Sequence, residues 1–213
     1  MKRHDKLAET IPYGTLGILA LESSRDMGKR VNDYIVDWRN DRAQNHATAA
    51  SFAGYNRDSF IIDSACPRFG SGEAKGIIRE SVRGQDLYIL VDVCNYNLTY
   101  TVCGQTNHMS PDDHYQDLKR IIAAVGGKAR RITVIMPFLY ESRQHRRSAR
   151  ESLDCALALQ ELTQMGVESI ITFDAHDPRV QNAIPLKSFE TVQPTYQFIK
   201  ALLKNVDDLK IDT

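Results

Sequence analysis

Short apolar runs alternate along the chain with longer stretches in which apolar residues recur every three or four positions. The apolar runs fall at 16–21, 60–62, 87–93, 132–136 and 169–173. Runs of this length that are apolar throughout are typical of strands buried on both faces, as in parallel sheets. Their alternation with helices predicts an α/β fold with three layers, αβα, around a mostly parallel sheet.

The periodic stretches predict four helices. The first follows an N-cap at Ser23 or Ser24 and ends near Arg39. The second opens at Ser110-Pro111, with a capping serine and a proline at the first helical position, and ends at Gly126. The third begins at about residue 151, and the fourth covers 195–204. The expected apolar stripes are Met27, Val31, Ile35 and Trp38 in the first helix, and Leu153, Ala156, Leu157 and Leu162 in the third.

Three segments lack either period and are predicted to be irregular. The segments 41–57 and 95–109 are expected to be long loops, and 67–76 a glycine-containing turn. A long loop in a compact domain indicates either a functional element or an insertion. The histidines of these segments and of the helix starts, His4, His46, His108 and His114, are expected at the surface.

The overall composition narrows the class of protein. Among 213 residues, 27 are basic and 27 acidic, so the net charge is zero. General binders of nucleic acid or of membrane surfaces usually carry a basic excess, and we expect neither partner here. No apolar run approaches the length of a membrane span, and the first residues lack the apolar core of a signal peptide. Four cysteines without metal-type spacing are expected to be reduced thiols in a cytoplasmic protein.

Four arginines follow the strand at 132–136, which Pro137 should end because proline cannot donate a ladder hydrogen bond. These residues are Arg143, Arg146, Arg147 and Arg150. Ligands of open α/β sheets bind at the carboxyl ends of the strands, and the guanidinium fork matches phosphate oxygens. The cluster therefore favours an anionic ligand, while a solvated run of charges is the alternative.

A second polar group, Asp174 to Asp177, follows the strand at 169–173 and places two carboxylates around His176. On its own, such a sequence is more often a turn or a cap than a ligand set. Beside an arginine cluster on a neighbouring strand, it is compatible with a metal ion that bridges phosphate oxygens. A third segment, 69–73, contains two glycines but lacks the spacing and the following helix of a dinucleotide-binding fingerprint.

Taken together, these motifs resemble the N-terminal half of ribose-phosphate pyrophosphokinase, from about residue 16 to residue 204. The resemblance lies in 69–73 (Phe-Gly-Ser-Gly-Glu), 82–86 (Val-Arg-Gly-Gln-Asp), 131–137 with Arg143-Gln144, and 170–176 (Ile-Ile-Thr-Phe-Asp-Ala-His). The resemblance implies a phosphoribosyltransferase-like domain that belongs to a homo-oligomer. It also implies transfer of pyrophosphate from ATP to ribose 5-phosphate with Mg²⁺, giving phosphoribosyl pyrophosphate and AMP.

The resemblance also assigns roles to single residues. Phe69 would stack on adenine and Glu73 would bind its edge, with Ser71 and Gly72 in the same turn, which belongs either to the same subunit or to a neighbouring one. Arg143, Gln144 and His145 would lie on the adenine and phosphates, and His176, with Asp174 nearby, on the Mg²⁺–ATP site. Residues 1–204 would be the ATP-side domain, and 205–213 the start of a connection to a second domain that carries the ribose-phosphate loop.

Three positions differ from the usual pattern of the family. Ser71 and His145 stand where aspartate is common, and Lys187 stands near an expected acid. These differences leave two alternatives open besides the enzyme: a non-catalytic, regulatory relative, and a nucleotide-sensing module.

Overall fold

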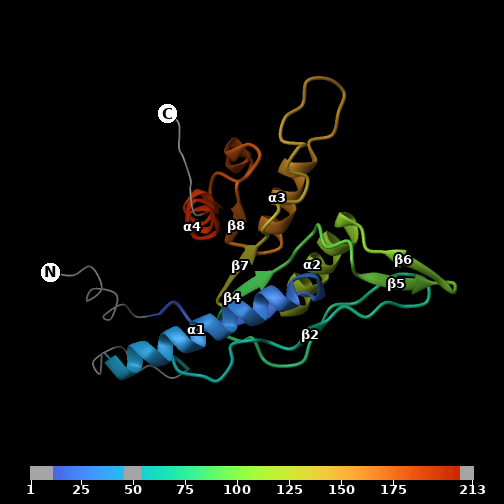
Figure 1. Ribbon diagram of the computed structural model, residues 1–213. Helices are drawn as coiled ribbons and strands as arrows, with labels where there is room; N and C mark the ends of the chain where they lie inside the picture. The colour runs from blue at the N-terminus through green and yellow to red at the C-terminus, as the bar shows by residue number, and fades with distance from the viewer. Residues whose placement is uncertain (1–11, 46–53, 207–213) are drawn as a thin grey trace, which may run out of the picture.

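Five parallel strands form the central sheet, in the order β1-β4-β7-β8-β9 (Figure 1). The computed structural model describes residues 12–45 and 54–206. The strands are Thr15–Ala20 (β1), Gln85–Leu90 (β4), Arg131–Ile135 (β7), Ser169–Phe173 (β8) and Ser188–Val192 (β9). The predicted α/β architecture with a mostly parallel sheet is confirmed. The edge strand β9 was not predicted, because its side chains are only partly buried and its sequence has no continuous apolar run.

The segment 60–62 lies beside β1 at the other edge of the sheet. Its predicted strand is reduced to a single parallel bridge between Ile18 and Ile61, flanked by two backbone hydrogen bonds of 2.8 Å. The chain thus runs from β1 outward to this segment, and then returns to β4 and continues in the opposite direction. This reversal makes the sheet doubly wound, and it is the reason that helices cover both of its faces.

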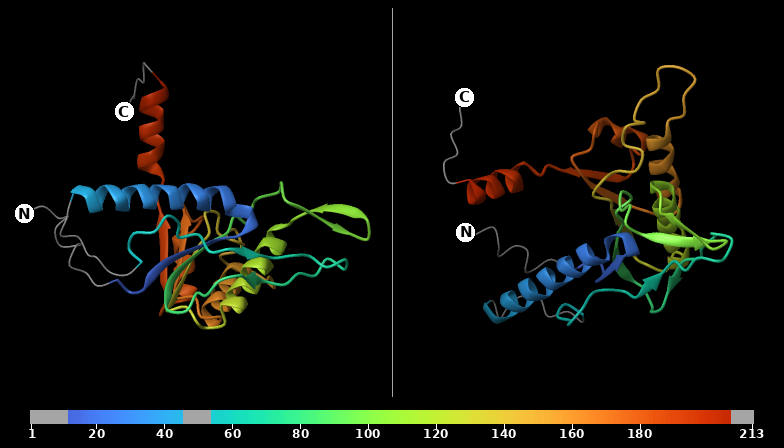
Figure 2. Two further views of the ribbon diagram at one scale, coloured as in Figure 1. Left: turned by 90° about the horizontal axis from the view of Figure 1, so that it is seen from below. Right: turned by 45° about the vertical axis from the view of Figure 1, so that its right-hand side comes forward.

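One helix covers the first face and two helices cover the second (Figures 1 and 2). Arg25–Asn45 (α1) packs its apolar residues on Ile18, Phe60 and Leu90. Pro111–Val125 (α2) and Asp154–Gln164 (α3) pack on the larger core beneath β4, β7 and β8. The predicted start of α2 is confirmed by a capping box between Ser110 and Asp113, and its predicted end by Gly126 in the left-handed conformation.

Several predicted boundaries and stripes were wrong. The helix α1 continues to Asn45, so the start of the expected loop at 41–57 is helical, while 46–53 lie outside the described residues. Trp38 is half exposed and stacks with Arg42 instead of joining the core. Ser23 and Ser24 cap no helix, because they lie in a short 3₁₀ turn (Glu22–Ser24, η2) and bond the chain that follows β4. At these positions tertiary contacts outweighed the local sequence propensities on which the predictions were based.

The third helix begins later than predicted and is rotated relative to the predicted stripe. It starts at Asp154, and its buried residues are Cys155, Ala158, Leu159 and Leu162, whereas Leu157 is exposed. The periodicity did predict a helix here, but the choice among overlapping apolar positions was wrong. Another 3₁₀ helix, Pro178–Ala183 (η3), follows β8 and packs against α3.

The segment 95–109 is not a loop but carries a β-hairpin. Thr99–Val102 (β5) pairs with Gln105–His108 (β6) across a tight turn in which Cys103 and Gly104 both have positive φ. A shorter pair, Ser64–Ala65 (β2) and Ile77–Ile78 (β3), closes the base of the segment that contains Phe69. His114 is buried and contacts the Asn95 carbonyl oxygen at 2.8 Å, contrary to the expected surface position.

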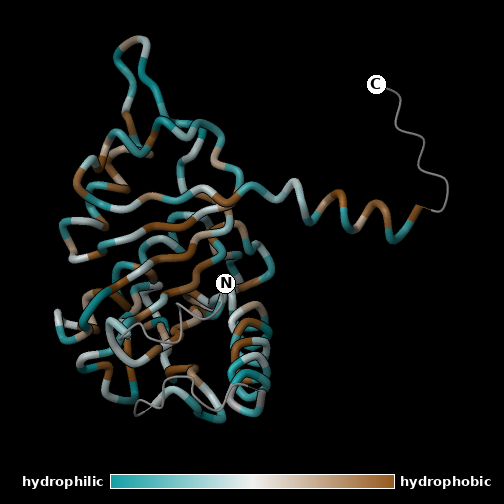
Figure 3. The backbone as a smooth tube through the Cα atoms, turned by 90° about the vertical axis from the view of Figure 1, so that its left-hand side faces the viewer, coloured by the Kyte–Doolittle hydropathy of each residue, from teal (hydrophilic) through white to brown (hydrophobic). Residues whose placement is uncertain are grey.

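The final helix, Thr195–Asn205 (α4), projects away from the body of the molecule (Figure 3). None of its residues is buried, although it carries Phe198, Ile199, Leu202 and Leu203. In the part of the chain that the structure describes, no helix is long and apolar enough to cross a membrane. The predicted connection at 205–213 begins at the end of α4, because Asn205 is still helical, and its residues 207–213 lie outside the described residues.

The four cysteines are all unpaired. Burial raises the pKa of the Cys66 thiol to about 12 and that of Cys155 to about 11. Both side chains therefore remain protonated at neutral pH. Cys155 packs in the core, whereas Cys66 Sγ donates to the Asp117 carbonyl oxygen at 3.8 Å.

Candidate functional site

Two polar loops leave the sheet side by side at its carboxyl edge. The strands β7 and β8 are neighbours, with Val134 opposite Ile170. Beyond the paired residues, the Phe173 amide still donates to the Pro137 carbonyl oxygen at 3.2 Å. The arginine loop that follows Pro137 is thereby fixed beside the Asp174–Asp177 turn, as the order of strands predicted.

A pocket of about 310 Å³ lies between these two loops. Its polar lining includes Arg143 from the first loop, and Asp174 and His176 from the second. All three of these side chains are exposed to solvent. Phe138, Leu139 and Phe173 form its apolar lining. The structure thus brings together the two strand-end groups that were predicted from the sequence.

Backbone strain accompanies the pocket on both sides. Glu141 and Asp174 have positive φ of 55° and 44°, a conformation that is uncommon for residues other than glycine. The turn at Asp174 is held by its amide, which donates to the Val192 carbonyl oxygen at 3.0 Å, and by the Ala175 amide, which donates to Thr191 Oγ1 at 2.9 Å. Strained residues that persist are often found where a site must be preorganised.

The arginine loop carries an excess of uncompensated positive charge. Arg143, Arg146, Arg147 and Arg150 are exposed and form no ion pair with any residue of the described segments. An anion that bound here would displace no existing partner, and charge-assisted hydrogen bonds to guanidinium are strong. Gln144 follows Arg143 in the loop, and its backbone amide donates to the Glu141 carbonyl oxygen at 2.9 Å.

His145 lies behind the pocket rather than in it. Its Nε2 is 3.5 Å from Asp177 Oδ2, and its ring meets that of His176 edge to face at 5.1 Å between centroids. Its Nδ1 is buried and has no hydrogen-bond partner among the described residues. Asp177 also accepts hydrogen bonds from Arg179, which lower its pKa well below the usual range. His145 thus ties the arginine loop to the turn after β8, an arrangement the sequence did not reveal.

The donors present suit Mg²⁺ only in combination with phosphate. No three His, Cys, Asp or Glu side chains of the described chain lie close enough together to hold a metal ion. Asp174 and His176 offer one carboxylate and one imidazole. Mg²⁺ commonly keeps several waters and is bound by one or two carboxylates plus substrate phosphates, so this pair fits a shared Mg²⁺–phosphate site and not a dedicated metal centre.

The turn 69–73 is located elsewhere in the molecule. The Phe69 amide donates to the Glu73 carbonyl oxygen at 2.7 Å, Ser71 Oγ donates to Glu73 Oε2 at 2.9 Å, and Gly72 has φ of 91°. The Phe69 ring is half exposed, with Lys75 Nζ 6.0 Å from its centroid.

The structure does not bring this turn to the pocket within one chain. Figure 1 shows it beside the β5–β6 hairpin, well away from the loop that precedes α3. In the described residues, no hydrogen bond or ion pair joins the turn to Arg143 or His176, and the turn does not line the pocket that these two residues share. Of the predicted site residues, Arg143, Asp174 and His176 share a pocket, while Phe69, Ser71, Gly72 and Glu73 form a separate group.

The fold places this chain in the class of doubly wound α/β proteins, whose ligands generally bind at the carboxyl ends of the strands. Residues 16–166 match the family described as the N-terminal domain of ribose phosphate pyrophosphokinase. The chain therefore belongs to the ribose phosphate pyrophosphokinase family, as its motifs indicated.

Individual relatives agree with this assignment. Ribose-phosphate pyrophosphokinase 1 of Schizosaccharomyces pombe is 31% identical over 148 residues, which cover 68% of this chain and 32% of that protein. The ribose-phosphate pyrophosphokinase of Mesorhizobium japonicum is 28% identical, and the match covers 68% and 43%. The crystal structure of phosphoribosylpyrophosphate synthetase from Mycobacterium smegmatis superposes with a TM-score of 0.65 at 20% identity, covering 90% of this chain and 52% of that one. The chain thus spans about half or less of the length of these relatives.

Proposed function

We propose that this chain is the ATP- and Mg²⁺-binding half of a ribose-phosphate pyrophosphokinase, which transfers pyrophosphate from ATP to ribose 5-phosphate. The observation that carries the proposal is the pocket at the ends of β7 and β8. There, Arg143, which has no ion-pair partner among the described residues, lies with Asp174 and His176 around one cavity. Family membership supplies the reaction class.

In this proposal each group has a separate task. Arg143 and Gln144 hold the phosphates and the adjoining part of the adenosine, and His145 keeps their loop against Asp177. Asp174 and His176 hold Mg²⁺, which when bound neutralises charge on the transferring phosphates. Phe69 stacks on adenine and Glu73 accepts from its amino edge. Ribose 5-phosphate would bind to the part of the full-length family proteins that this chain does not span.

Binding of ATP with and without Mg²⁺ tests the metal part of the proposal. We expect His176→Ala to weaken ATP binding in Mg²⁺ by roughly tenfold and to leave binding in EDTA unchanged, because one lost ligand or charge-assisted contact is worth about 1.5–3 kcal/mol. Titration calorimetry measures both constants. His108→Ala is the matched control, since His108 is an exposed histidine on the β5–β6 hairpin. An equal loss of ATP affinity in Mg²⁺ and in EDTA would show that His176 does not belong to the metal site.

The separation of Phe69 from Arg143 supports an adenine pocket formed between two copies of the chain, and therefore a homo-oligomer. We expect Phe69→Ala and Arg143→Ala each to weaken ATP binding strongly, and a mixture of the two variants to regain tight binding at about a quarter of the sites in a two-fold dimer. Titration of the equilibrated mixture counts these sites. Sedimentation of the same samples reports the dimer. A monomeric protein, or a mixture without tight sites, contradicts the shared pocket.

A second candidate function is a non-catalytic relative that regulates an active partner. It is favoured by Ser71 and His145, which stand where aspartate is common in the family, and by Lys187, which stands near an expected acid. Ser71 bonds Glu73, the residue assigned to adenine, and His145 is engaged with Asp177 instead of the pocket. If the wild-type protein self-associates but shows no Mg²⁺-dependent binding of ATP, this alternative is favoured.

A further inference from the structure

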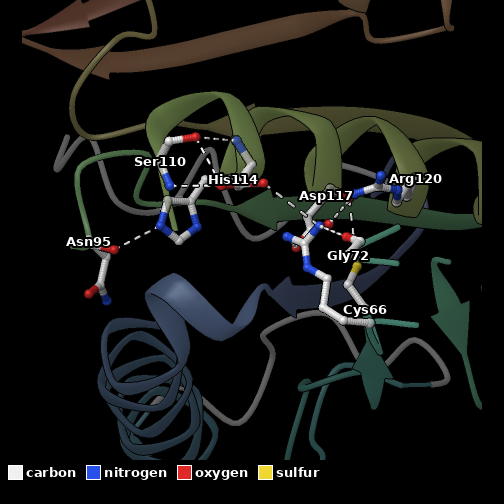
Figure 4. A network of polar contacts seen from close by, with 9 residues as sticks. Cys66, Gly72, Asn95, Ser110, His114, Asp117 and Arg120 are labelled. Atoms are coloured by element: carbon white, nitrogen blue, oxygen red, sulfur yellow. Dashed lines mark hydrogen bonds and ion pairs between the residues drawn. The ribbon is translucent and has the colours of Figure 1, made fainter. Parts of the chain in front are cut away.

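Arg68 lies at the junction of three elements that meet beside the turn 69–73. Its side chain is only 12% exposed, although it belongs to a connecting segment on the surface. Figure 4 shows the surrounding polar network, in which the segment that contains Cys66 and Gly72 lies against α2. Arginine is rarely buried to this extent unless its charge is paired.

The guanidinium contacts the turn, α2 and β5 at the same time. Nη2 donates to Asp117 Oδ2 of α2 at 3.0 Å, and Nη1 donates to the Gly72 carbonyl oxygen at 3.4 Å. Nη1 also lies 3.8 Å from Asp113 Oδ1, and the guanidinium carbon is 4.8 Å from the centre of the Tyr100 ring of β5. A single side chain therefore connects the turn to α2 and to the β5–β6 hairpin.

The anchor in α2 is itself fixed. Asp117 is buried and accepts a second hydrogen bond, of 2.6 Å, from Arg120. Burial raises the pKa of Asp117, and the two guanidinium groups oppose that shift by stabilising the carboxylate. Because Asp113, Asp117 and Arg120 are spaced at four and three residues, they share one face of the helix, which is the face turned toward the segment.

Gly76 fixes the far end of the same segment. A Cβ atom at Gly76 would lie 2.4 Å from the backbone oxygen of Arg120, so the chain passes directly over α2 at this point. Between Arg68 and Gly76, the turn carries Phe69 with half of its ring exposed. Gly72 packs against the hairpin, where its Cβ would lie 3.0 Å from Val102.

We infer that Arg68 is a positioning residue, which holds the turn 69–73 in a preorganised conformation for stacking on a purine base. This inference rests on the proposed function, because it assumes that Phe69 meets adenine. A fixed turn avoids the entropic cost of ordering Phe69 when the ligand binds. The consequence is selectivity: Arg68 strengthens binding of the base and leaves binding of the phosphates unchanged.

Titration of two ligands separates these contributions. ATP carries the base, whereas inorganic tripolyphosphate presents the phosphates alone, and both are used with Mg²⁺ on the full chain. We expect Arg68→Gln to weaken ATP binding by about tenfold, the loss of one charge-assisted anchor, with tripolyphosphate binding changed less than about twofold. Arg79→Gln is the matched control, because Arg79 pairs with Asp63 at 2.9 Å in the same region with both side chains exposed. It should change neither constant.

Hydrogen exchange of the peptide 68–76 gives an independent readout. Exchange in this peptide should speed up in Arg68→Gln and stay at the wild-type rate in Arg79→Gln. If Arg68→Gln does not fold, Arg68→Lys takes its place, since lysine keeps the charge but lacks the fork that reaches Asp117 and Gly72 together.

The two possible failures are distinguishable. A wild-type protein that binds ATP no better than tripolyphosphate has no purine site, which overturns the proposed function and this inference with it. If the wild-type protein prefers ATP to tripolyphosphate and Arg68→Gln keeps that whole preference, only the role of Arg68 is overturned.

Discussion

The purified 213-residue chain is expected to form no AMP from ATP, Mg²⁺, inorganic phosphate and ribose 5-phosphate, while still binding ATP. Transfer requires the ribose hydroxyl to be aligned with the β-phosphorus. Such alignment lowers the activation barrier by roughly 7–11 kcal/mol, so without it the rate falls below what an ordinary assay detects. The only phosphate-binding group we propose in the described residues is the pocket around Arg143, which ATP itself would fill.

A coupled assay that detects AMP decides this prediction. The control is the same assay without ribose 5-phosphate, which corrects for hydrolysis of ATP. AMP formation that depends on ribose 5-phosphate would show that this chain contains its own acceptor site. The ATP-side assignment would then have to be revised.

Arg143→Ala is expected to weaken ATP binding by about tenfold or more. The guanidinium is exposed at the pocket and has no ion-pair partner in the described part of the chain, so its full charge is available to phosphate. Charge-assisted hydrogen bonds are worth about 1.5–3 kcal/mol each, and a bidentate pair contributes more than one of them. The folded structure should be unaffected, because no described side chain loses a bond when Arg143 is removed.

Calorimetry with ATP measures the effect, and Arg57→Ala serves as the control because Arg57 is an exposed arginine without an ion pair among the described residues. The effect should shrink as salt concentration rises, since exposed charges are screened. If Arg143→Ala binds ATP with unchanged affinity, the arginine loop is a solvated run of charges, which is the alternative that the sequence left open.

The sequence was most informative where burial is complete. In β4 and β7 the central residues are buried and largely apolar because both faces of the sheet are covered, so their apolar runs identify these strands directly. At β9 and in the β5–β6 hairpin this information is missing: Thr99 and Thr101 are exposed, and their pairing depends on a turn at Cys103-Gly104 that carries no usual hairpin sequence. Strands that are mostly exposed leave little trace in the hydrophobic pattern.

The candidate site was predicted unevenly for a similar reason. Arg143 and His176 were placed together because parallel neighbouring strands end at the same edge of a sheet. The contacts of Arg68 with Asp117 and of His145 with Asp177 join segments far apart in sequence, and charges alone do not specify which of many pairs will form.

The order of strands in the sheet also bears on how the chain folds. From β4 to β9 each strand pairs with the next sheet strand along the sequence, so these pairings close comparatively short loops. The pairing of Thr15 with Gln85 spans the longest interval, because all of α1 and the Phe69 segment lie between β1 and β4. Loop closure costs more entropy as the intervening chain lengthens. We therefore expect β1 and α1 to dock late in folding, on a sheet that is already assembled from β4 onward.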